Sequence, residues 1–417
     1  MLTTNEFTAC STLSNNRTGK GGHQVLLALM SDKPGNQMNS QSMQHPKSHS
    51  TALLNHESEV LMTTKPIRTI CIMAVAVLVL CGIISPGIAT SQTTTLKTCW
   101  QPEHSTYIIW DPIQKGWDKE AGLKIEMIYF DSGMAQMEAL AAKQWVAGGT
   151  GSVPMLVGAM RFGAYMIAIA NDDSLANAVL VRPNSPILKA KGVNKDFPET
   201  YGSAETVKGK TVLVTTVSSG HYALSTWLKR IGLKDTDVVI QNMDQGQALA
   251  AFESGVGDIA VLWAPSMFIG MSKGWKMVNT DSQKGANMTN VIVADKAWAD
   301  KNPEQVAKFL QVYFRGIDRM KAENVKLAPG FSKFLLDWAG VKMSVEDAAE
   351  DIKIHTVYSL DEQLKFFDSS KGPSQVDQWM QGMADFFVEQ KRFKREEMDQ
   401  AMKSGFVTDK FLKMLKK

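Results

Sequence analysis

Three short segments of glycine and small hydroxyl residues give this sequence a way to bind an anion. They are Ser132-Gly133, Thr150-Gly151-Ser152 and Ser218-Ser219-Gly220, and each follows a β-like run and precedes a helical one. The first turn of a helix has free backbone N–H groups and a partial positive charge, so it can hold a sulfonate, nitrate or carboxylate. The serines can also simply cap their helices, which is worth about 1 kcal/mol each. Because the pattern occurs three times, we favour anion binding.

Other side chains could contact the same ligand. Trp100 and Trp263 lie near the ends of β-like runs and could form an apolar wall or a cation–π contact. His221 could donate to an anion, although a helix N-terminus disfavours its charged form. Asp258 could hold an ammonium group or could equally begin a strand. The candidate ligand-binding residues are Trp100, Gln101, Ser132, Gly133, Thr150, Gly151, Ser152, Ser218, Ser219, Gly220, His221, Asp258 and Trp263.

The sequence lacks the known motifs for catalysis or metal binding. The segment from Gly202 to Thr211 imitates a phosphate-binding loop, but six residues separate its glycines where the motif needs four. After residue 91 the histidines are His104, His221 and His355, which are far apart in sequence. We therefore predict no catalytic residue, no metal ion and no cofactor.

The candidate loops require a scaffold of alternating strands and helices. Residues 123–130 alternate as a strand does, and Ser132 can cap a helix that continues through Trp145. Two further units follow: a strand at 211–216 with a helix to Ile231, closed by Gly232, and a helix at 247–254 with a strand at 258–263, ended by Pro265. This alternation predicts an α/β fold with a largely parallel sheet, in which ligand loops lie at the carboxyl ends of the strands.

The N-terminal part differs from the rest of the chain. Residues 1–61 are polar without an apolar period, so we expect no fold there. The apolar run Ile70–Ile84 and the small residues after it predict a signal peptide over 62–91, with Met62 as the true start. Two alternatives stay open: an uncleaved membrane anchor, for which the run is short, and lipid attachment at Cys81.

The composition argues against nucleic-acid binding and against disulfide or zinc sites. Lys and Arg number 45 against 42 Asp and Glu, a net charge of +3 that is too balanced for a protein that binds nucleic acid through its phosphates. After residue 91 the one cysteine is Cys99, which excludes an internal disulfide and a cysteine-rich zinc site in that part.

Eight segments, taken in order, carry a family resemblance. They are Phe130–Gly133, Met137–Ala142, Gly149–Pro154, Val207–Val212, Ser218–His221, Gly232–Val238, Gln247–Gly255 and Gly257–Pro265. In order and spacing the set resembles the periplasmic substrate-binding proteins of ABC importers, in the nitrate/sulfonate/taurine group. Two departures bear on the ligand: residues 143–149 lack an acidic residue that relatives usually have, and residues 185–204 form a longer stretch than usual.

The resemblance implies a two-lobed, type II (venus-flytrap) periplasmic binding protein fold with a hinge. We expect lobe 1 over 92–185 and 288–417 and lobe 2 over 186–287. The amphipathic helices expected at 303–321, 345–358, 375–389 and 394–403 would form a C-terminal tail packed on the outside of a lobe.

The implied function is capture of a small anionic solute between closing lobes and its delivery to a membrane permease with its ATPase. We expect an exported, periplasmic binding protein that is not an enzyme, and among solutes we favour an organosulfonate such as taurine. The alternatives are nitrate or a pyrimidine precursor as the solute, a ligand-sensing module, or an enzyme like the pyrimidine-precursor synthases of this fold. The enzyme is disfavoured because those synthases carry a cysteine-rich motif.

Overall fold

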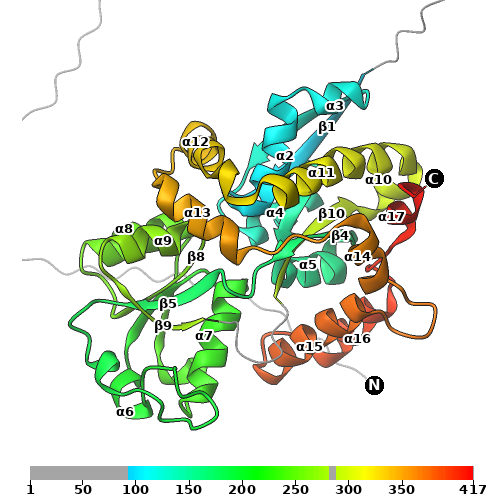
Figure 1. Cartoon of the computed structure of the whole chain (residues 1–417). Coiled ribbons are helices and arrows are strands. Elements are labelled where there is room, and N and C mark those ends of the chain that lie inside the picture. The colour runs from blue at the N-terminus through cyan, green and yellow to red at the C-terminus, as the bar shows by residue number, and fades with distance from the viewer. Residues whose placement is uncertain (1–92, 281–287, 417) are drawn as a thin grey trace, which may run out of the picture. The chain divides into compact units, whose positions relative to one another are not determined.

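The computed structural model describes residues 93–280 and 288–416, which form two five-stranded sheets with helices around them (Figure 1). The expected N-terminal extension, the signal peptide and Cys81 lie outside the described residues. Within the described part, no helix combines the length and the apolar character that crossing a bilayer requires.

The first sheet has the strand order β2-β1-β3-β10-β4. β1 pairs in parallel with β2 and β3, while β10 is antiparallel to β3 and β4. Its strands β3 and β10 are buried along their whole length, because helices cover both faces of the sheet. The elements of this lobe are β1 (Thr94–Trp100), α2 (His104–Gln114), α3 (Trp117–Glu120), β2 (Leu123–Tyr129), α4 (Gly133–Ala141), β3 (Ala147–Gly151), α5 (Ser152–Val157), the π-helical turn η1 (Gly158–Phe162), β4 (Ala164–Asp172), β10 (Thr289–Asp295), α10 (Lys296–Lys301) and α11 (Pro303–Glu323).

The second sheet repeats this arrangement with the order β7-β6-β8-β5-β9. β6 is parallel to β7 and β8, and β5 is antiparallel to β8 and β9. Its elements are β5 (Asn177–Val181), η2 (Pro186–Lys189), α6 (Ala204–Val207), β6 (Thr211–Val214), α7 (Ser219–Arg230), η3 (Asp235–Asp237), β7 (Val239–Asn242), α8 (Gln245–Glu253), β8 (Ile259–Trp263), α9 (Ser266–Ser272) and β9 (Lys276–Thr280). The α/β prediction is thus confirmed, with both parallel and antiparallel strands in each sheet.

The chain crosses from the first sheet to the second earlier than expected. β4 ends at Asp172 and β5 begins at Asn177, so the crossover lies at 173–176 and not at the expected boundary of 185. The five residues of β5 are all buried, because both faces of this strand are covered inside the second sheet.

Several predicted elements agree closely with the structure. Ser132 and Ser218 cap α4 and α7 as expected, and Gly232, with φ +79°, ends the turn after α7. The helix predicted at 345–358 stops at Ile354, because His355 adopts an extended backbone.

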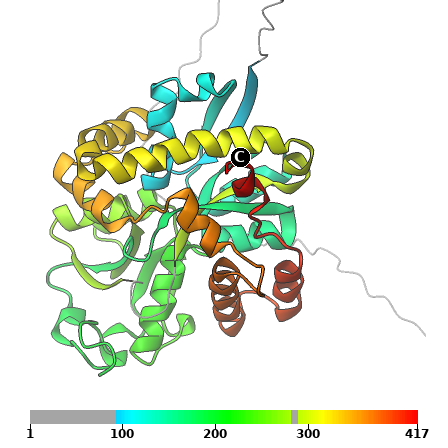
Figure 2. The ribbon, with the colours of Figure 1, turned by 45° about the vertical axis from the view of Figure 1, so that its right-hand side comes forward.

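The C-terminal tail contacts both lobes, which corrects the expectation that it packs on the outside of one. Its α15 lies beside α5 of the first lobe and beside α7 of the second (Figures 1 and 2). The rings of Tyr222 in α7 and Phe386 in α15 are 4.5 Å apart, and the backbone N–H of Met166 in β4 donates to the carbonyl of Phe406. The tail comprises η4 (Asn324–Leu327), α12 (Ala328–Ala339), α13 (Val345–Ile354), α14 (Leu360–Phe366), α15 (Gln375–Glu389), α16 (Arg395–Lys403) and α17 (Lys410–Met414).

Candidate ligand-binding site

The N-termini of α4 and α5 meet at the carboxyl ends of the first sheet's strands. The Ser132 hydroxyl accepts from the N–H of Ala135 at 3.4 Å, which leaves earlier N–H groups of α4 free. A Cβ atom on Gly133 would lie 2.3 Å from Pro154 Cγ and 2.9 Å from Thr150 Oγ1. A glycine is therefore required for the two helix ends to approach this closely.

Two buried polar groups beside these helix ends have no hydrogen-bond partner among the described residues. Thr150 is fully buried, and its Oγ1 makes no hydrogen bond to any residue that the structure describes. Gln101 donates to Gln136 Oε1 at 3.4 Å, but its own Oε1 is likewise unpartnered within residues 93–280 and 288–416. Leaving a buried polar group unpaired costs roughly 1–3 kcal/mol, so such atoms point to a place where water or a ligand binds.

Ser152 serves a different purpose from its neighbour Thr150. Its hydroxyl donates to the carbonyl of Thr289 at 2.5 Å and lies 3.0 Å from the Thr289 hydroxyl. Because the side chain is fully buried, this contact fixes the start of α5 to β10. The Ser152 hydroxyl is thus occupied by the protein, while Gly151 leaves the backbone beside it uncovered.

In the second lobe, the equivalent loop lies at the start of α7. The Ser218 hydroxyl accepts from the N–H of His221 at 3.2 Å and donates to the Thr215 carbonyl at 2.6 Å. A Cβ on Gly220 would be 3.6 Å from the Trp263 ring, so this half-buried ring flanks the first turn of α7, where Ser219 also lies. The prediction that Trp263 forms an apolar wall for the ligand stays a prediction, and the ring lies where it could do so.

The loops of the two lobes are joined through the crossover. Asn290, at the start of β10 near α5, donates to Asp173 at 3.5 Å, and Asn177 donates to the same carboxylate at 3.1 Å. Asn177 pairs with Trp263 across β5 and β8. The N-termini of α5 and α7 are therefore connected by a short series of direct contacts.

Three predicted ligand residues serve the protein's own structure, which corrects the prediction for each of them. Trp100 is fully buried and stacks on Tyr313, with ring centroids 6.1 Å apart. Asp258 accepts from the N–H of Thr211 at 2.9 Å at the amino end of β8, away from the helix N-termini. His221 is fully buried, and both of its ring nitrogens have protein partners.

An acidic pair that was not predicted from the sequence lies beside these loops. Asp131 precedes the cap of α4 and accepts from the Tyr129 hydroxyl at 3.0 Å. Asp244 precedes α8, and burial together with the negative charge of Asp131 raises its pKa. Since the two carboxylates come from different lobes and interact, they could hold a cationic group between them. In the sequence, Asp131 directly precedes the predicted cap Ser132, and Asp244 lies three residues before the helix predicted at 247–254.

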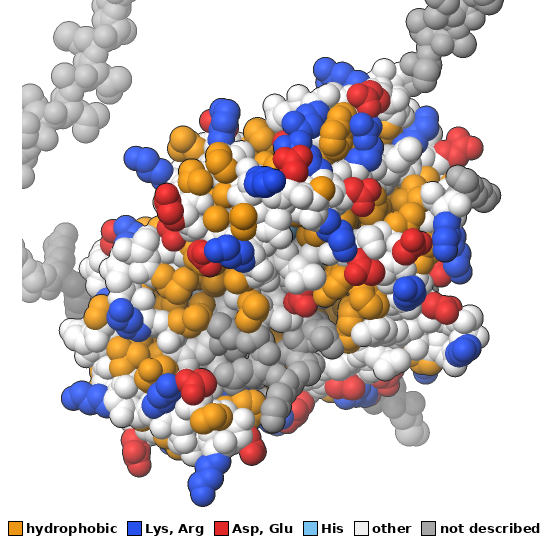
Figure 3. Space-filling view, in the orientation of Figure 1, with side chains coloured by type: hydrophobic (Ala, Val, Ile, Leu, Met, Phe, Trp, Pro, Cys, Tyr) orange, Lys and Arg blue, Asp and Glu red, His pale blue; other side chains and the backbone are white. Residues whose placement is uncertain are grey.

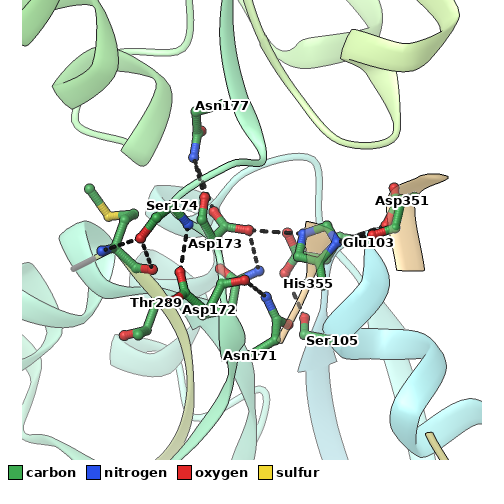
Figure 4. Close-up of polar contacts among 12 residues, drawn as sticks. Glu103, Ser105, Asn171, Asp172, Asp173, Ser174, Asn177, Thr289, Asp351 and His355 are labelled. Carbon is green, nitrogen blue, oxygen red and sulfur yellow. Dashed lines mark hydrogen bonds and ion pairs between the residues drawn. The ribbon is translucent and has the colours of Figure 1, made fainter. Parts of the chain in front are cut away.

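A second buried cluster, centred on Asp173 and His355, lies at the hinge (Figure 4). His355 Nε2 is 3.2 Å from Asp173 Oδ1, and its Nδ1 is 2.9 Å from Asp351 Oδ1. Burial alone would lower the pKa of His355, but the two carboxylates outweigh it and raise the pKa well above its ordinary value. The charged imidazolium therefore links the crossover to the segment after α13.

Glu103 and His104 complete the hinge cluster. Glu103 accepts from the Ser105 hydroxyl at 2.9 Å, and burial and the charge of Asp173 raise its pKa to about 7. The His104 ring stacks on His355 with centroids 4.6 Å apart, and burial and the His355 charge lower its pKa. Among the described residues, no group of His, Cys, Asp and Glu is arranged to hold a metal ion.

Comparison with known proteins agrees with this architecture. Residues 101–325 match the family model described as NMT1/THI5 like. The chain is 32% identical over 262 residues to a Brachyspira hyodysenteriae protein provisionally named an ABC transporter periplasmic binding protein, covering 62% of this chain and 75% of that one. It is 30% identical over 196 residues to the taurine-binding periplasmic protein of Escherichia coli, covering 46% of this chain and 56% of that protein.

Solved structures share the fold. The alkanesulfonate-binding protein from Xanthomonas axonopodis pv. citri, bound to MOPS, matches with a TM-score of 0.58 at 18% identity, covering 74% of this chain and 97% of that one. The periplasmic nitrate-binding protein from Synechocystis matches with a TM-score of 0.60 at 13% identity, covering 78% and 88%. These matches confirm the periplasmic binding protein fold, and all four of these relatives are named as binding proteins rather than enzymes. With the family match extending over more than half of its length, the chain belongs to the NMT1/THI5-like family.

Proposed function

We propose that this protein is the exported solute-binding protein of an ABC importer and that it captures a small organosulfonate such as taurine between its lobes. The observation that carries the proposal is the buried Thr150 hydroxyl, which has no partner in the described part of the chain, beside the free N-terminus of α4. A sulfonate oxygen would satisfy that hydroxyl and the nearby N–H groups together. The α7 N-terminus would complete the site from the second lobe.

The charges near the loops favour a zwitterion over a simple anion. Asp131 and Asp244 would repel nitrate, but they would attract the ammonium group of taurine while helix ends hold its sulfonate. On the face shown in Figure 3, basic and acidic side chains are mixed, so attraction for an anion would come from the local site and not from a basic surface. The relative named as a taurine-binding protein supports the same ligand class.

The mechanism follows from the two-lobed fold. Lobe 1 binds the solute first, and lobe 2 closes over it because the solute has a higher affinity for the closed form. The closed form would dock on the permease, which is driven by its ATPase. The predicted signal peptide over 62–91 would export the protein to the periplasm, in agreement with the relatives that are named as periplasmic.

A thermal-shift screen tests the proposal with taurine, ethanesulfonate, nitrate and a pyrimidine precursor as probes. A solute at 100 times its dissociation constant stabilises the folded protein by about 2.7 kcal/mol. We expect taurine to give the largest rise in Tm and ethanesulfonate a smaller one, since it lacks the ammonium group. A rise with nitrate or the pyrimidine and none with either sulfonate would overturn the proposed ligand.

A further inference from the structure

The second-lobe loop contains a residue in an unusual backbone conformation. Val217 has φ +56°, in the left-handed region that β-branched residues rarely adopt because of steric cost. It directly precedes Ser218 and Ser219, which begin α7. Some contact must hold this residue in place, because the conformation is not intrinsically favourable.

That contact comes from the buried ring of His221. Its Nδ1 accepts from the backbone N–H of Val217 at 3.1 Å, and its Nε2 lies 2.9 Å from Asp235 Oδ2. Since Nδ1 accepts an N–H group, it carries no proton, and the ring proton is on Nε2, from which it donates to Asp235. The ring in this tautomer satisfies both partners.

Asp235 connects this ring to the C-terminal tail. Its Oδ1 accepts from the Ser225 hydroxyl at 2.7 Å, and its Oδ2 also accepts from Arg392 Nη2 at 3.1 Å. Burial tends to raise the pKa of Asp235, but the hydrogen bonds from His221, Ser225 and Arg392 outweigh it and lower the pKa to about 2. The carboxylate therefore remains ionised at neutral pH and can hold all three donors.

The tail also packs directly against the ring. Phe387 in α15 meets His221 edge to face, with centroids 6.4 Å apart, and Phe386 contacts Tyr222. Because α15 lies against α5 of the first lobe as well, the tail contacts both the first lobe and the His221 ring, which supports the ligand loop of the second lobe.

We propose that the C-terminal tail controls solute affinity through a relay from Arg392 to Asp235, to His221 and to the backbone N–H of Val217. The relay holds the loop so that the first turn of α7 presents its free N–H groups to the solute. His221 is thus a positioning residue, which acts through the loop backbone. The inference rests on the proposed function, because the loop is taken to contact the solute.

Two replacements of His221 test its contacts with Val217 and with Asp235 one at a time. In His221→Asn, the side-chain oxygen takes the place of Nδ1 and can still accept from Val217, whereas in His221→Gln the amide takes the place of Nε2 and reaches Asp235. We expect the Val217 amide proton to exchange about tenfold faster in His221→Gln, the effect of losing one hydrogen bond, and to change much less in His221→Asn. An unchanged exchange rate at Val217 in His221→Gln overturns the relay.

A pair of tail variants tests control by the tail. Arg392→Gln removes the contact with Asp235, while Arg395→Gln, the matched control, removes ion pairs only with Asp385 and Asp399 inside the tail. We expect Arg392→Gln to weaken taurine binding about three- to tenfold through faster dissociation, since a charge-assisted hydrogen bond is lost. Arg392→Lys should restore much of the affinity, and Arg395→Gln should bind as the wild type does.

The outcomes keep the relay distinct from the proposed ligand. If taurine binds Arg392→Gln and Arg395→Gln equally well, the relay is wrong and the proposed function stands. If the wild type does not bind taurine, the proposed ligand is wrong, and exchange at Val217, measured without ligand, still decides on the relay.

Discussion

The two lobes prepare their ligand loops by different means. In the first lobe the loop is fixed by its own sheet and helix ends, since Ser152 bonds Thr289 and Gly133 lies against Pro154. In the second lobe the loop is held by side chains from farther along the chain, with His221 supported by Asp235 and the tail. The comparison indicates a preformed half-site in the first lobe and an adjustable one in the second. Substitutions should therefore act differently on the two sides.

The largest effect is expected at the hinge that joins the two lobes. The pKa of Glu103 is about 7 in the folded protein, against an ordinary value of 4.5, so the folded state binds more protons between these two pH values. The contribution of Glu103 to the free energy of unfolding should then fall by about 3 kcal/mol as the pH rises from 4.5 through 7.

Glu103→Gln should remove this fall, because the amide stays neutral at every pH. Urea unfolding at pH 5 and pH 8 measures the change, with the exposed Glu138→Gln as the control that keeps the wild-type pH dependence. If Glu103→Gln loses as much stability between pH 5 and pH 8 as the wild type does, Glu103 is not the group responsible. If Glu103→Gln changes the stability of the protein but not its taurine binding, the hinge acts independently of the two half-sites.

The next effect should come from Gly133 in the first lobe. Gly133→Ala places a Cβ within 2.3 Å of Pro154, and because backbone must shift to make room, we expect a loss of about 1–3 kcal/mol in stability. Taurine binding should weaken together with it, as measured by calorimetric titration. Gly246→Ala in α8 is the matched control, since a Cβ there meets no atom within 4 Å and should leave both quantities nearly unchanged. Equal behaviour of the two variants would contradict a preformed first half-site.

Substitutions at Thr150 and at Ser152 should have opposite effects: one should weaken ligand binding and the other should lower stability. Thr150→Val removes a hydroxyl that makes no hydrogen bond within the described chain, so the unliganded protein should lose no stability, while taurine affinity should fall about tenfold through one missing hydrogen bond. Ser152→Ala should show the reverse pattern, because its hydroxyl bonds Thr289. The two measurements are Tm and the dissociation constant of taurine, each for both variants. A lower Tm with unchanged taurine affinity in Thr150→Val would rule out this role for the Thr150 hydroxyl.

The smallest effect is expected from the acidic pair. Asp131→Asn should weaken taurine binding by about threefold, in the range of a partly exposed ion pair. It should leave ethanesulfonate binding unchanged or slightly stronger, because ethanesulfonate has no ammonium group. The ratio of the dissociation constants of taurine and ethanesulfonate is the measurement. An unchanged ratio would show that the acidic pair does not contact the ammonium group.

Local features of the fold can be predicted from the sequence, and long-range ones cannot. Ser132 and Ser218 are recognisable as helix caps because a cap depends on a few neighbouring residues. The bounds of α15 follow from its apolar period. Such features are encoded within a single turn or a single helix, where spacing is informative.

Trp100 and His221 show why the site itself is harder to predict. Local spacing leaves a ligand contact open for His221, because it reveals neither the bond to Asp235 nor the tether from Arg392, which is 157 residues from Asp235. The position of Trp100 at a strand end favours a ligand wall, although Tyr313, more than two hundred residues later, covers it. Partners that meet only in the folded chain decide which polar or aromatic side chains remain free for a ligand.

A crystal structure of the protein with taurine tests the central claim most directly. We expect the sulfonate oxygens to lie within about 3 Å of the Thr150 hydroxyl and of backbone N–H groups in the first turn of α7, the usual hydrogen-bond distance. The ammonium group should lie between Asp131 and Asp244. Taurine bound elsewhere, or contacting one lobe without the other, would contradict capture between the two half-sites.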